Sequence, residues 1–414
     1  MRFLRVLSFV ALFLSAGVST TASIVDHAFR PFATKTFTSI INAIVVQPDG
    51  RYLVGGTFTV ANGYSYSGLA RFNPDHSIDR GFRSTVTGTV KCLQILSDGK
   101  ILVCGSIHHT VNNISYEGVA RLNPDGSVDQ TFLGGTGASG IKTVSVQPDG
   151  KIIVGGAFST ISGISRLGVA RLNSNGTVDQ TFDAHINGWV SAVLALQDGN
   201  ILIGGEPFTV NGGSIRSLVL VDTNGVLNSS FAPSLSGTVL KIKQFADGKI
   251  LVGGRFTVSS SSTLMNDLFR LNADCSLDEG FRYAFGIYQG YTYDFDRQAD
   301  GKLLIGGLFG AFGGGPSKSL FRVTEDGSID TAFTPMFGTL VNAVGVLPDH
   351  EIIVGGSRNE QLGYRNMFYR LDANGSLGPD QPISFGFPAL VASLGFLPNG
   401  KILIAGDFSE VNGK

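Results

Sequence analysis

A tight turn built on Asp-Gly recurs about every 50 residues, and this period constrains the fold more than any other feature of the chain. The segment "VQPDGKIIVGGAF" (Val146–Phe158) has close copies in "VQPDGRYLVGGTF" from Val46, "FADGKILVGGRF" from Phe245 and "LPNGKILIAGDF" from Leu397. The eight corresponding turns begin at Asp49, Asp98, Asp149, Asp198, Asp247, Asp300, Asp349 and Asn399. Self-similarity at such a period is typical of stacked supersecondary units.

Each unit divides into the same four segments. An apolar strand such as "INAIVVQ" leads through the Asp-Gly turn into a second strand with paired glycines, which predict a bulge or a close backbone approach. A third strand such as "GVARLN" and a turn "NPDGS" then lead to a short fourth strand, "VDQTF". No segment has a convincing helical period. The sequence therefore predicts an all-β fold, a β-propeller of about eight four-stranded blades, with a solenoid of similar period as the alternative.

The two ends of the chain bear on the closure of this ring. The N-terminal "VDHAF" (Val25–Phe29) matches a fourth strand without a third strand before it, and the last unit stops at Lys414 after its second strand. The N-terminal segment is therefore expected to supply the outermost strand of the last blade, since closure removes open sheet edges. The natural chain is expected to continue past Lys414, which leaves the last blade incomplete here.

The N-terminus also predicts export. Arg2 and Arg5 precede the apolar run "VLSFVALFLSAGV" (Val6–Val18), which is too short to span a bilayer comfortably, and small residues follow it. Residues 1–22 are interpreted as a signal peptide, with an uncleaved N-terminal anchor as the alternative. Residues 24–414 are interpreted as the propeller, and the location as secreted or cell surface. No other run is long enough for a membrane span, so none is expected in the mature chain.

The repeated signature resembles a known family. The segments "QPDGKIIVGGAF" (Gln147–Phe158) and "RLNPDGSVDQTF" (Arg121–Phe132) are similar to the delta-60 repeat, found in bacterial exported proteins expected to form propellers. The similarity covers essentially the whole chain after the signal. The resemblance implies the fold and the export, and it brings no catalytic residues.

The second turn of each unit raises the possibility of a calcium loop. In "RLNPDGSVD" (Arg121–Asp129), Asn123, Asp125 and Asp129 fall at ligand positions, but an Arg takes the first position, where calcium requires an oxygen. The favoured interpretation is structural, with Arg121 opposite Asp129 across a hairpin. The one unit with Leu220 in place of the Arg also has Asn228 in place of the Asp, which supports this pairing, while the seventh unit departs from it, with Arg370 opposite Gly378. No metal site, cofactor or catalytic residue is predicted.

Two adjacent first strands carry charges where the other units have mostly small or polar residues. The fifth unit has Lys241 and Lys243, and the sixth has Asp294 and Asp296. The favoured interpretation is an ionic lock between blades, and the alternative is a polar ligand site at the channel mouth. Tyr291 and Tyr293 stand next to these residues and either fill the gap between blades or stack on a sugar. The candidate ligand-binding residues are therefore Tyr291, Tyr293, Asp294, Asp296, Lys241 and Lys243.

The three cysteines are too few to form a disulfide framework. Cys92 and Cys104 are expected opposite each other across a hairpin, either as a disulfide or as two buried thiols. Cys275 replaces the glycine of a second turn and is expected to be exposed. Trp189 begins a first strand and is expected to pack.

The net charge of −1 gives no reason to expect nucleic acid as a partner. The favoured function is a non-catalytic binding or scaffold module that recognises a protein or a glycan through its inter-strand loops. The alternatives are a polysaccharide-acting propeller enzyme, with Asp294, Asp296 and His108 at the channel, and a calcium-dependent surface repeat protein. The enzyme is less favoured because the charges form repeated pairs instead of converging on one point. The sequence does not specify an oligomeric state.

Overall fold

The computed structural model of the chain describes most of the repeat region. The described residues are 40–47, 49, 51–57, 60–61, 64–65, 67–73, 78–134, 137–138, 140–259, 264–281, 290–309, 319–335, 340–346, 352–357, 367–376, 383–384, 390–396 and 402–407. The predicted signal peptide and the segment Val25–Phe29 lie outside the described residues.

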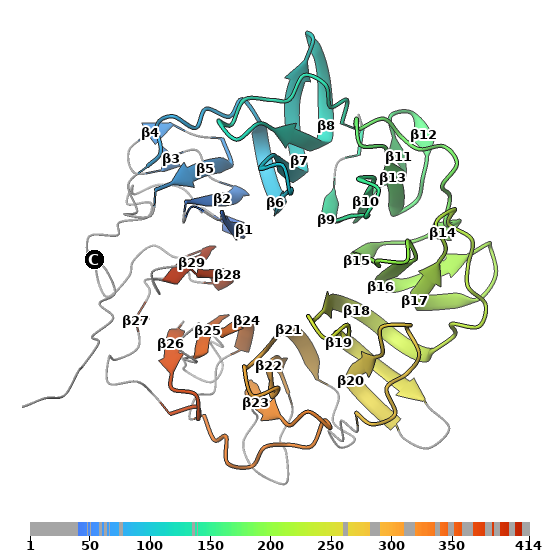
Figure 1. Cartoon of the computed structure of the whole chain (residues 1–414), viewed down its shortest axis with the longest axis vertical. Coiled ribbons are helices and arrows are strands. Elements are labelled where there is room, and N and C mark those ends of the chain that lie inside the picture. Colours follow the sequence, from blue (N-terminus) through green and yellow to red (C-terminus); the bar gives the residue numbers. More distant parts are fainter. Residues whose placement is uncertain are drawn as a thin grey trace, which may run out of the picture.

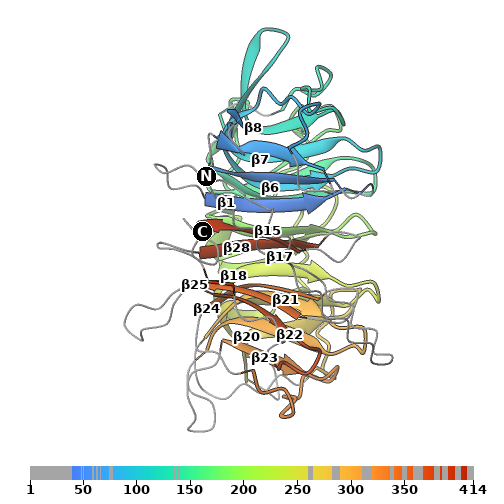
Figure 2. The ribbon, with the colours of Figure 1, turned by 90° about the vertical axis from the view of Figure 1, so that its left-hand side faces the viewer.

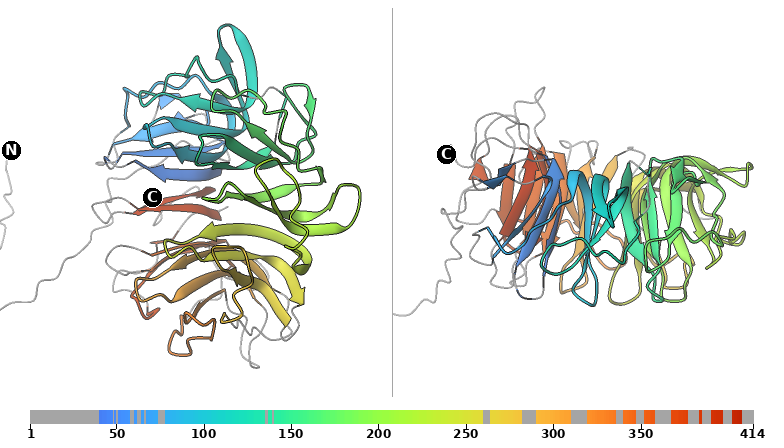
Figure 3. Two further views of the ribbon diagram at one scale, coloured as in Figure 1. Left: turned by 45° about the vertical axis from the view of Figure 1, so that its right-hand side comes forward. Right: turned by 90° about the horizontal axis from the view of Figure 1, so that it is seen from above.

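The chain forms a ring of antiparallel sheets, and each repeat unit contributes one blade (Figure 1). The first strand of each unit lies innermost. These strands are β1 (Ile40–Val46), β6 (Thr87–Ile95), β9 (Ile141–Val146), β15 (Val190–Ala195), β18 (Ser234–Gln244), β21 (Tyr291–Arg297), β24 (Leu340–Val346) and β28 (Leu390–Phe396). Seen from the side, the strands run through the thickness of the ring (Figure 2 and Figure 3).

The second strand of each unit pairs antiparallel with the first, and it is the middle strand of the blade in the units whose third strand is described. The second strands are β2 (Tyr52–Thr57), β7 (Ile101–Val111), β10 (Ile152–Gly156), β16 (Ile201–Val210), β19 (Ile250–Ser259), β22 (Leu303–Leu308), β25 (Ile352–Ser357) and β29 (Ile402–Asp407). The third strands are β5 (Leu69–Phe72), β8 (Ile114–Leu122), β13 (Val169–Leu172), β17 (Ile215–Val221), β20 (Leu264–Leu271), β23 (Leu320–Val323) and β26 (Met367–Leu371).

The predicted fourth strand is very short. After the second turn the chain forms a single bridge back to the third strand, as between Leu122 and Val128. Two separate two-stranded sheets are formed by β3 (Val60–Ala61) with β4 (Tyr64–Ser65) and by β11 (Thr160–Ile161) with β12 (Ile164–Ser165). The short strands β14 (Ile186–Asn187) and β27 (Ile383–Ser384) extend blade sheets by pairing with β16 and β26.

The units form a closed ring instead of the straight stack of a solenoid. The first strand of the first unit, β1, contacts both β28 and β29 of the last unit, and Figure 1 shows these strands side by side. The described residues contain strands and no helix, which confirms the all-β β-propeller fold. Within the described part of the chain, no helix meets the length and apolarity that a bilayer span requires.

The paired glycines have the predicted role. The ladder between first and middle strands shifts register at this point, as between Gly155 and Gly156. A Cβ atom on Gly155 would lie 2.7 Å from Cγ1 of Val190 in the next blade, and one on Gly306 would lie 2.5 Å from Cγ1 of Val341. The first glycine of the pair therefore lets the middle strand approach the neighbouring blade.

The core lies between blades. Ile153 and Val169 of the third unit share one buried cluster with Val190 and Ile203 of the fourth. A thin antiparallel sheet cannot bury its apolar faces alone, so each blade buries one face against the next. The site-bearing inner strands are thus fixed by contacts with a neighbouring repeat.

Candidate functional site

The repeated Arg–Asp pair forms as the sequence predicts. Nε of Arg121 donates to Oδ2 of Asp129 at 2.8 Å, and Nζ of Lys100 donates to the same oxygen at 2.8 Å. The same pairing joins Arg71 to Asp79, Arg171 to Asp179, Arg270 to Asp278, and Arg322 to Asp330. The carboxylate oxygen that the calcium hypothesis needs is therefore held by two cations.

The charge state of this carboxylate follows from these contacts. Burial acts to raise the pKa of Asp129, but hydrogen bonds from Lys100, Thr131 and Arg121 outweigh it and hold the pKa well below its ordinary value. Among the residues that the structure describes, no group of three or more His, Cys, Asp and Glu is arranged to hold a metal ion.

The same arginine also reaches the next blade. The Arg121 guanidinium lies 4.7 Å from the centre of the Phe132 ring and donates from its other nitrogen to the main-chain oxygen of Ser174, 53 residues further along the chain. Arg71, Arg171 and Arg322 donate in the same way to Pro124, Thr223 and Ala373. The arginine thus joins adjacent blades, a role that the sequence analysis did not include.

The predicted ion pairs join the innermost strands of the fifth and sixth blades. Nζ of Lys241 lies 3.0 Å from Oδ1 of Asp294, and Nζ of Lys243 lies 2.7 Å from Oδ1 of Asp296. The Asp294 carboxylate raises the pKa of Lys241. Both ion pairs expected for an ionic lock between these blades are therefore present. The two lysine side chains are more than two-fifths exposed.

The second oxygen of each aspartate binds the seventh blade. Oδ2 of Asp294 accepts from the Val344 main-chain N–H at 3.1 Å, and Oδ2 of Asp296 accepts from that of Val346 at 3.1 Å. Each aspartate of β21 therefore connects β18 on one side with β24 on the other. Ser145 makes the equivalent contact in the third blade, where its hydroxyl accepts from the Ala195 N–H at 3.0 Å.

The two predicted tyrosines pack against each other at the start of β21. The rings of Tyr291 and Tyr293 are stacked, with centroids 5.6 Å apart and an interplanar angle of 10°. The Arg255 guanidinium lies 4.9 Å from the centre of the Tyr291 ring. The structure thus brings the candidate tyrosines, lysines and aspartates together on two neighbouring inner strands.

An aspartate beside this group was missed from the sequence. Asp267 is buried and adopts a left-handed backbone, φ 63°, where three other blades have Gly68, Gly118 and Gly168. Its carboxylate accepts from the main-chain N–H groups of Gly290 at 2.6 Å and Phe256 at 3.1 Å. Burial raises the pKa of Asp267 to about 6. In the sequence, Asp267 could have been recognised because it stands where other repeats have a glycine.

Trp189 is exposed, so the prediction that it packs is wrong. The residue is 54% exposed just before β15, and Nζ of Lys142 from the neighbouring blade lies 5.7 Å from the centre of the indole ring. A Cβ atom on Gly205 would clash with the main-chain oxygen of Trp189. In the sixth blade, a Cβ atom on Gly307 would clash with the main-chain oxygen of Tyr291. Trp189 and Tyr291 therefore occupy equivalent positions, at the same end of the ring.

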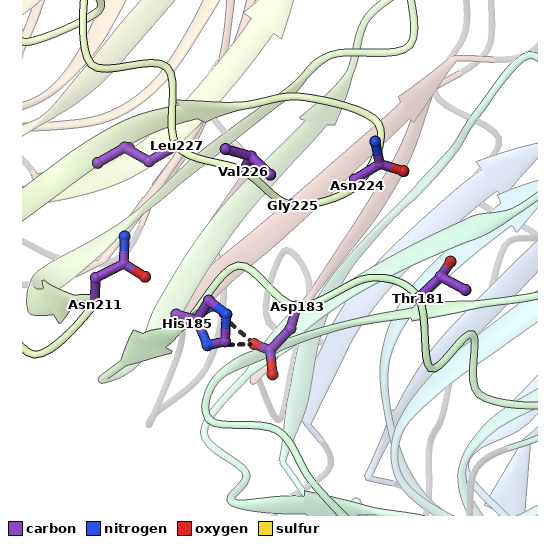
Figure 4. Close-up of a pocket in the computed structure, with 8 residues that line it drawn as sticks. All are labelled: Thr181, Asp183, His185, Asn211, Asn224, Gly225, Val226 and Leu227. Atoms are coloured by element: carbon purple, nitrogen blue, oxygen red, sulfur yellow. Dashed lines mark hydrogen bonds and ion pairs between the residues drawn. The ribbon is translucent and has the colours of Figure 1, made fainter.

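A pocket of about 270 Å³ lies between the third and fourth blades. Figure 4 shows the Asp183 and His185 side chains on one side of it and the turn with Asn224 and Val226 on the other. Nδ1 of His185 lies 3.6 Å from Oδ1 of Asp183, and Arg166 lies 3.1 Å from the other carboxylate oxygen. This pocket is not evident from the sequence, because its two walls come from different repeats.

The cysteines differ in part from expectation. Cys92 and Cys104 form a disulfide between β6 and β7, with Cα atoms 5.1 Å apart, which settles the two alternatives. Cys275 is only 3% exposed, so the expected exposure is wrong. Its turn packs on the preceding blade, where Cys275 shares a buried cluster with Phe231. Burial raises the pKa of the Cys275 thiol to about 12.

His108 lies apart from the inner-strand aspartates. It is on the long β7–β8 hairpin, where Nε2 lies 3.2 Å from Oε1 of Glu117. Its neighbour His109 is 3% exposed and packs against Tyr116, with ring centroids 5.7 Å apart. The three residues named for an enzyme therefore do not converge in the described structure.

Comparison with known proteins identifies the repeats. The model of a family described as a domain of unknown function (DUF5122) beta-propeller matches residues 47–82, 96–132, 147–182, 196–231, 246–281, 298–333 and 397–414, more than half of the chain. No curated protein matches the chain at a significant level.

Several solved structures, two of them described as propellers, are similar to this chain. The Dos1 propeller is 9% identical, with a TM-score of 0.45, and the match covers 90% of this chain and 91% of that one. The WD40 propeller domain of Doa1 is 14% identical, with a TM-score of 0.38 and coverage of 90% and 92%. The extracellular domain of a putative hybrid two component system from B. thetaiotaomicron is 13% identical, with a TM-score of 0.42 and coverage of 91% and 51%. At these values the likenesses carry no argument about function.

Proposed function

This chain belongs to the DUF5122 β-propeller family, and from that premise we propose that it is a non-catalytic module that binds carbohydrate outside the cell. The binding surface is the end of the ring where the innermost strands begin, with Trp189 as its main contact. The observation that carries the proposal is the 54% exposure of Trp189 beside Lys142.

A large exposed aromatic on a rigid frame is a recognition feature. Tryptophan supplies an apolar face and one N–H donor at little entropic cost, and it is enriched among residues that dominate binding energy. Trp189 immediately precedes β15, whose residues Val190 and Val193 are buried in a core cluster. The indole is thus presented by a well-packed strand. A sugar ring offers C–H groups to its face and hydroxyl groups to the Lys142 ammonium.

Tyr291 and Tyr293 extend this surface two blades away. Tyr291 occupies the position equivalent to Trp189, and Arg255 lies against its ring. We assign Tyr291 and Tyr293 to the ligand surface, and we assign Lys241, Lys243, Asp294 and Asp296 to the support of the inner strands below it.

The contacts of the aspartates favour binding over catalysis. Asp294 uses one oxygen for Lys241 and the other for the Val344 N–H, and Asp296 repeats this with Lys243 and Val346. A carboxylate with both oxygens engaged is poorly placed to accept a proton from a substrate. This observation argues against the polysaccharide-acting enzyme.

Export is part of the proposal and rests on the N-terminal sequence. Two arginines followed by the apolar run Val6–Val18 form the pattern of a signal peptide. The resemblance to the delta-60 repeats of bacterial exported proteins agrees with this assignment.

The single tryptophan makes the test direct. Because Trp189 is the only tryptophan in the chain, its fluorescence reports this position alone. Titration with a panel of soluble oligosaccharides is expected to shift the emission to shorter wavelength and to protect the indole from acrylamide quenching. Trp189→Ala is expected to abolish retention on the matching immobilised glycan without changing the melting temperature. A panel that leaves emission and quenching unchanged would sink the proposal.

A further inference from the structure

The pocket between the third and fourth blades is built from residues that the other repeats lack. Asp183 and His185 follow Phe182 in "FDAH", whereas the second unit has Leu133 and Gly135 after its Phe132. The segment after them forms a short strand, β14, which pairs with the next middle strand, β16, as the starts of β6 and β18 pair with β7 and β19. The presence of Asp183 and His185 is therefore the local departure from the repeat at this pocket.

One pocket residue adopts an unusual backbone conformation. His185 has φ 49°, in the left-handed region that costs a residue with a Cβ atom free energy, whereas the φ of 53° at Asn211 belongs to a hairpin turn that is also left-handed at Asn112 and Ser162. The Asn211 main-chain N–H donates to the His185 oxygen at 3.0 Å, and the His185 N–H donates to Oδ1 of Asp183 at 2.8 Å. These bonds fix the position from which the His185 imidazole enters the pocket (Figure 4).

The wall offers hydrogen-bonding groups and an apolar patch. Within the described structure, the side-chain amides of Asn211 and Asn224 have no protein partner, and the imidazole of His185 is 63% exposed. Val226, which is 62% exposed, and Leu227 add apolar surface on the opposite wall. Such a mixture of a few fixed polar groups with an apolar face is typical of small-molecule sites.

The chemistry of these groups selects the ligand. Two amides and an imidazole can each donate and accept. Oδ1 of Asp183, which accepts from the His185 N–H, and Oδ2, which pairs with Arg166, each keep a lone pair for one hydroxyl group. A ring that carries vicinal hydroxyl groups on one side and C–H groups on the other matches this wall. At about 270 Å³ the pocket has room for one such ring.

We propose that this pocket is a subsite for one monosaccharide unit of the carbohydrate that Trp189 contacts. His185 and Trp189 are four residues apart on the segment that contains β14, so their Cα atoms are at most roughly 14 Å apart. The ligand is therefore a glycan of more than one sugar unit, with one ring in the pocket and another on the indole. The inference rests on the proposed carbohydrate-binding role and adds its second point of contact.

The experiment uses one spectroscopic probe for each point of contact. The imidazole signals of the full mature chain are recorded by carbon–proton NMR, and the His185 signal is assigned from its loss in His185→Gln. Simple hexoses, N-acetylhexosamines and uronic acids are titrated first, and then their short oligomers, with Trp189 fluorescence followed in parallel. We expect one sugar class to shift the His185 signal saturably, and its oligomers to bind more tightly and shift the tryptophan emission as well.

Variants separate the pocket from the turn that carries it. Asn224→Ala is expected to weaken oligomer binding about tenfold, since it removes one hydrogen bond to the ligand. Asn175→Ala, at the same position of the turn in the third blade, is expected to leave the affinity unchanged.

Each outcome bears on one proposal. A tryptophan shift without a His185 shift overturns the pocket subsite and leaves the proposed function standing. A His185 shift with monosaccharides and no tryptophan change with any oligomer supports the pocket and overturns the role of Trp189. Saturable binding of zinc ions, with no response to any sugar, overturns the sugar subsite in favour of a metal site at His185 and Asp183.

Discussion

The guanidinium of Arg121 in the second blade donates a hydrogen bond to the main-chain oxygen of Ser174 in the third blade, while its Nε holds Asp129 at 2.8 Å. One side chain thereby fixes its own outer hairpin and the turn of its neighbour. Three more arginines repeat the inter-blade bond, so it is a structural element of the ring.

Replacing Arg121 with Met is expected to destabilise the protein by roughly 1–3 kcal/mol, because hydrogen bonds to a charged group are lost at a partly buried site. Asp129 keeps Lys100 as a partner, which limits the loss. The measurement is the free energy of unfolding in urea. Arg83→Met, at an exposed arginine, is the control and is expected to cost little. Equal losses for the two variants would contradict the inter-blade role.

The Lys243–Asp296 pair is expected to show a coupling free energy of about 0.5–1 kcal/mol, since the lysine is partly exposed and solvent screens the pair. A double-mutant cycle with Lys243→Met and Asp296→Asn measures this energy. Asp296→Asn is chosen because the oxygen of the new side-chain amide can still accept the hydrogen bond from the Val346 N–H. The coupling is expected to shrink in high salt. As a control, the effects of Lys243→Met and of Asp98→Asn, which lies in another blade, on the free energy of unfolding are expected to add. A coupling free energy of zero in low salt would show that the ion pair does not stabilise the contact between the blades.

The buried His109 is expected to make the protein acid-sensitive. Burial, with a smaller effect of His108, lowers its pKa from 6.5 to about 4, so the folded state holds His109 neutral while the unfolded chain takes up the proton. Stability from this group is therefore complete above about pH 6.5 and falls as the pH drops towards 4, by on the order of 3 kcal/mol.

The His109→Phe variant tests this expectation, because it keeps a ring against Tyr116. Its unfolding free energy is expected to fall less than that of the wild type between pH 6.5 and 4. His108→Gln, at the exposed neighbour that faces Glu117, is the control and should retain most of the dependence. An unchanged pH profile in His109→Phe would assign the acid sensitivity to other groups.

The three cysteines are expected to give a distinctive thiol count. The native mature chain should show no thiol that reacts rapidly, because Cys275 is buried with a raised pKa and the other two are bonded. Denaturation alone should expose one thiol, and denaturation with a reductant should expose three. Cys275→Gly should remove the first of these. Three reactive thiols without a reductant would contradict the disulfide.

The hairpins and their register could be predicted because their determinants are local. An Asp-Gly turn fixes which residues face each other, and this places Arg121 opposite Asp129 and Cys92 opposite Cys104. The lysine–aspartate pairs were also predictable, since opposite charges stood at equivalent positions of adjacent repeats.

The errors concern contacts between blades. The sequence predicts an exposed Cys275 because it takes the glycine position of a turn, yet it shares a buried cluster with Phe231 of the preceding blade. Trp189 was expected to pack because it adjoins an apolar strand, but it lies just outside the cluster that buries Val190. The pocket at His185 needs two walls from different repeats, and a single repeat shows only one of them.

The all-β class, the repeat and the hairpin register follow from the amino-acid sequence alone, because turn chemistry and strand alternation act between residues close in the chain. The buried faces, the direction in which Arg121 extends beyond its own hairpin, and the position of the pocket are set by the packing of the blades. Those features depend on residues about 50 positions apart that meet only once the sheets have curved into a ring.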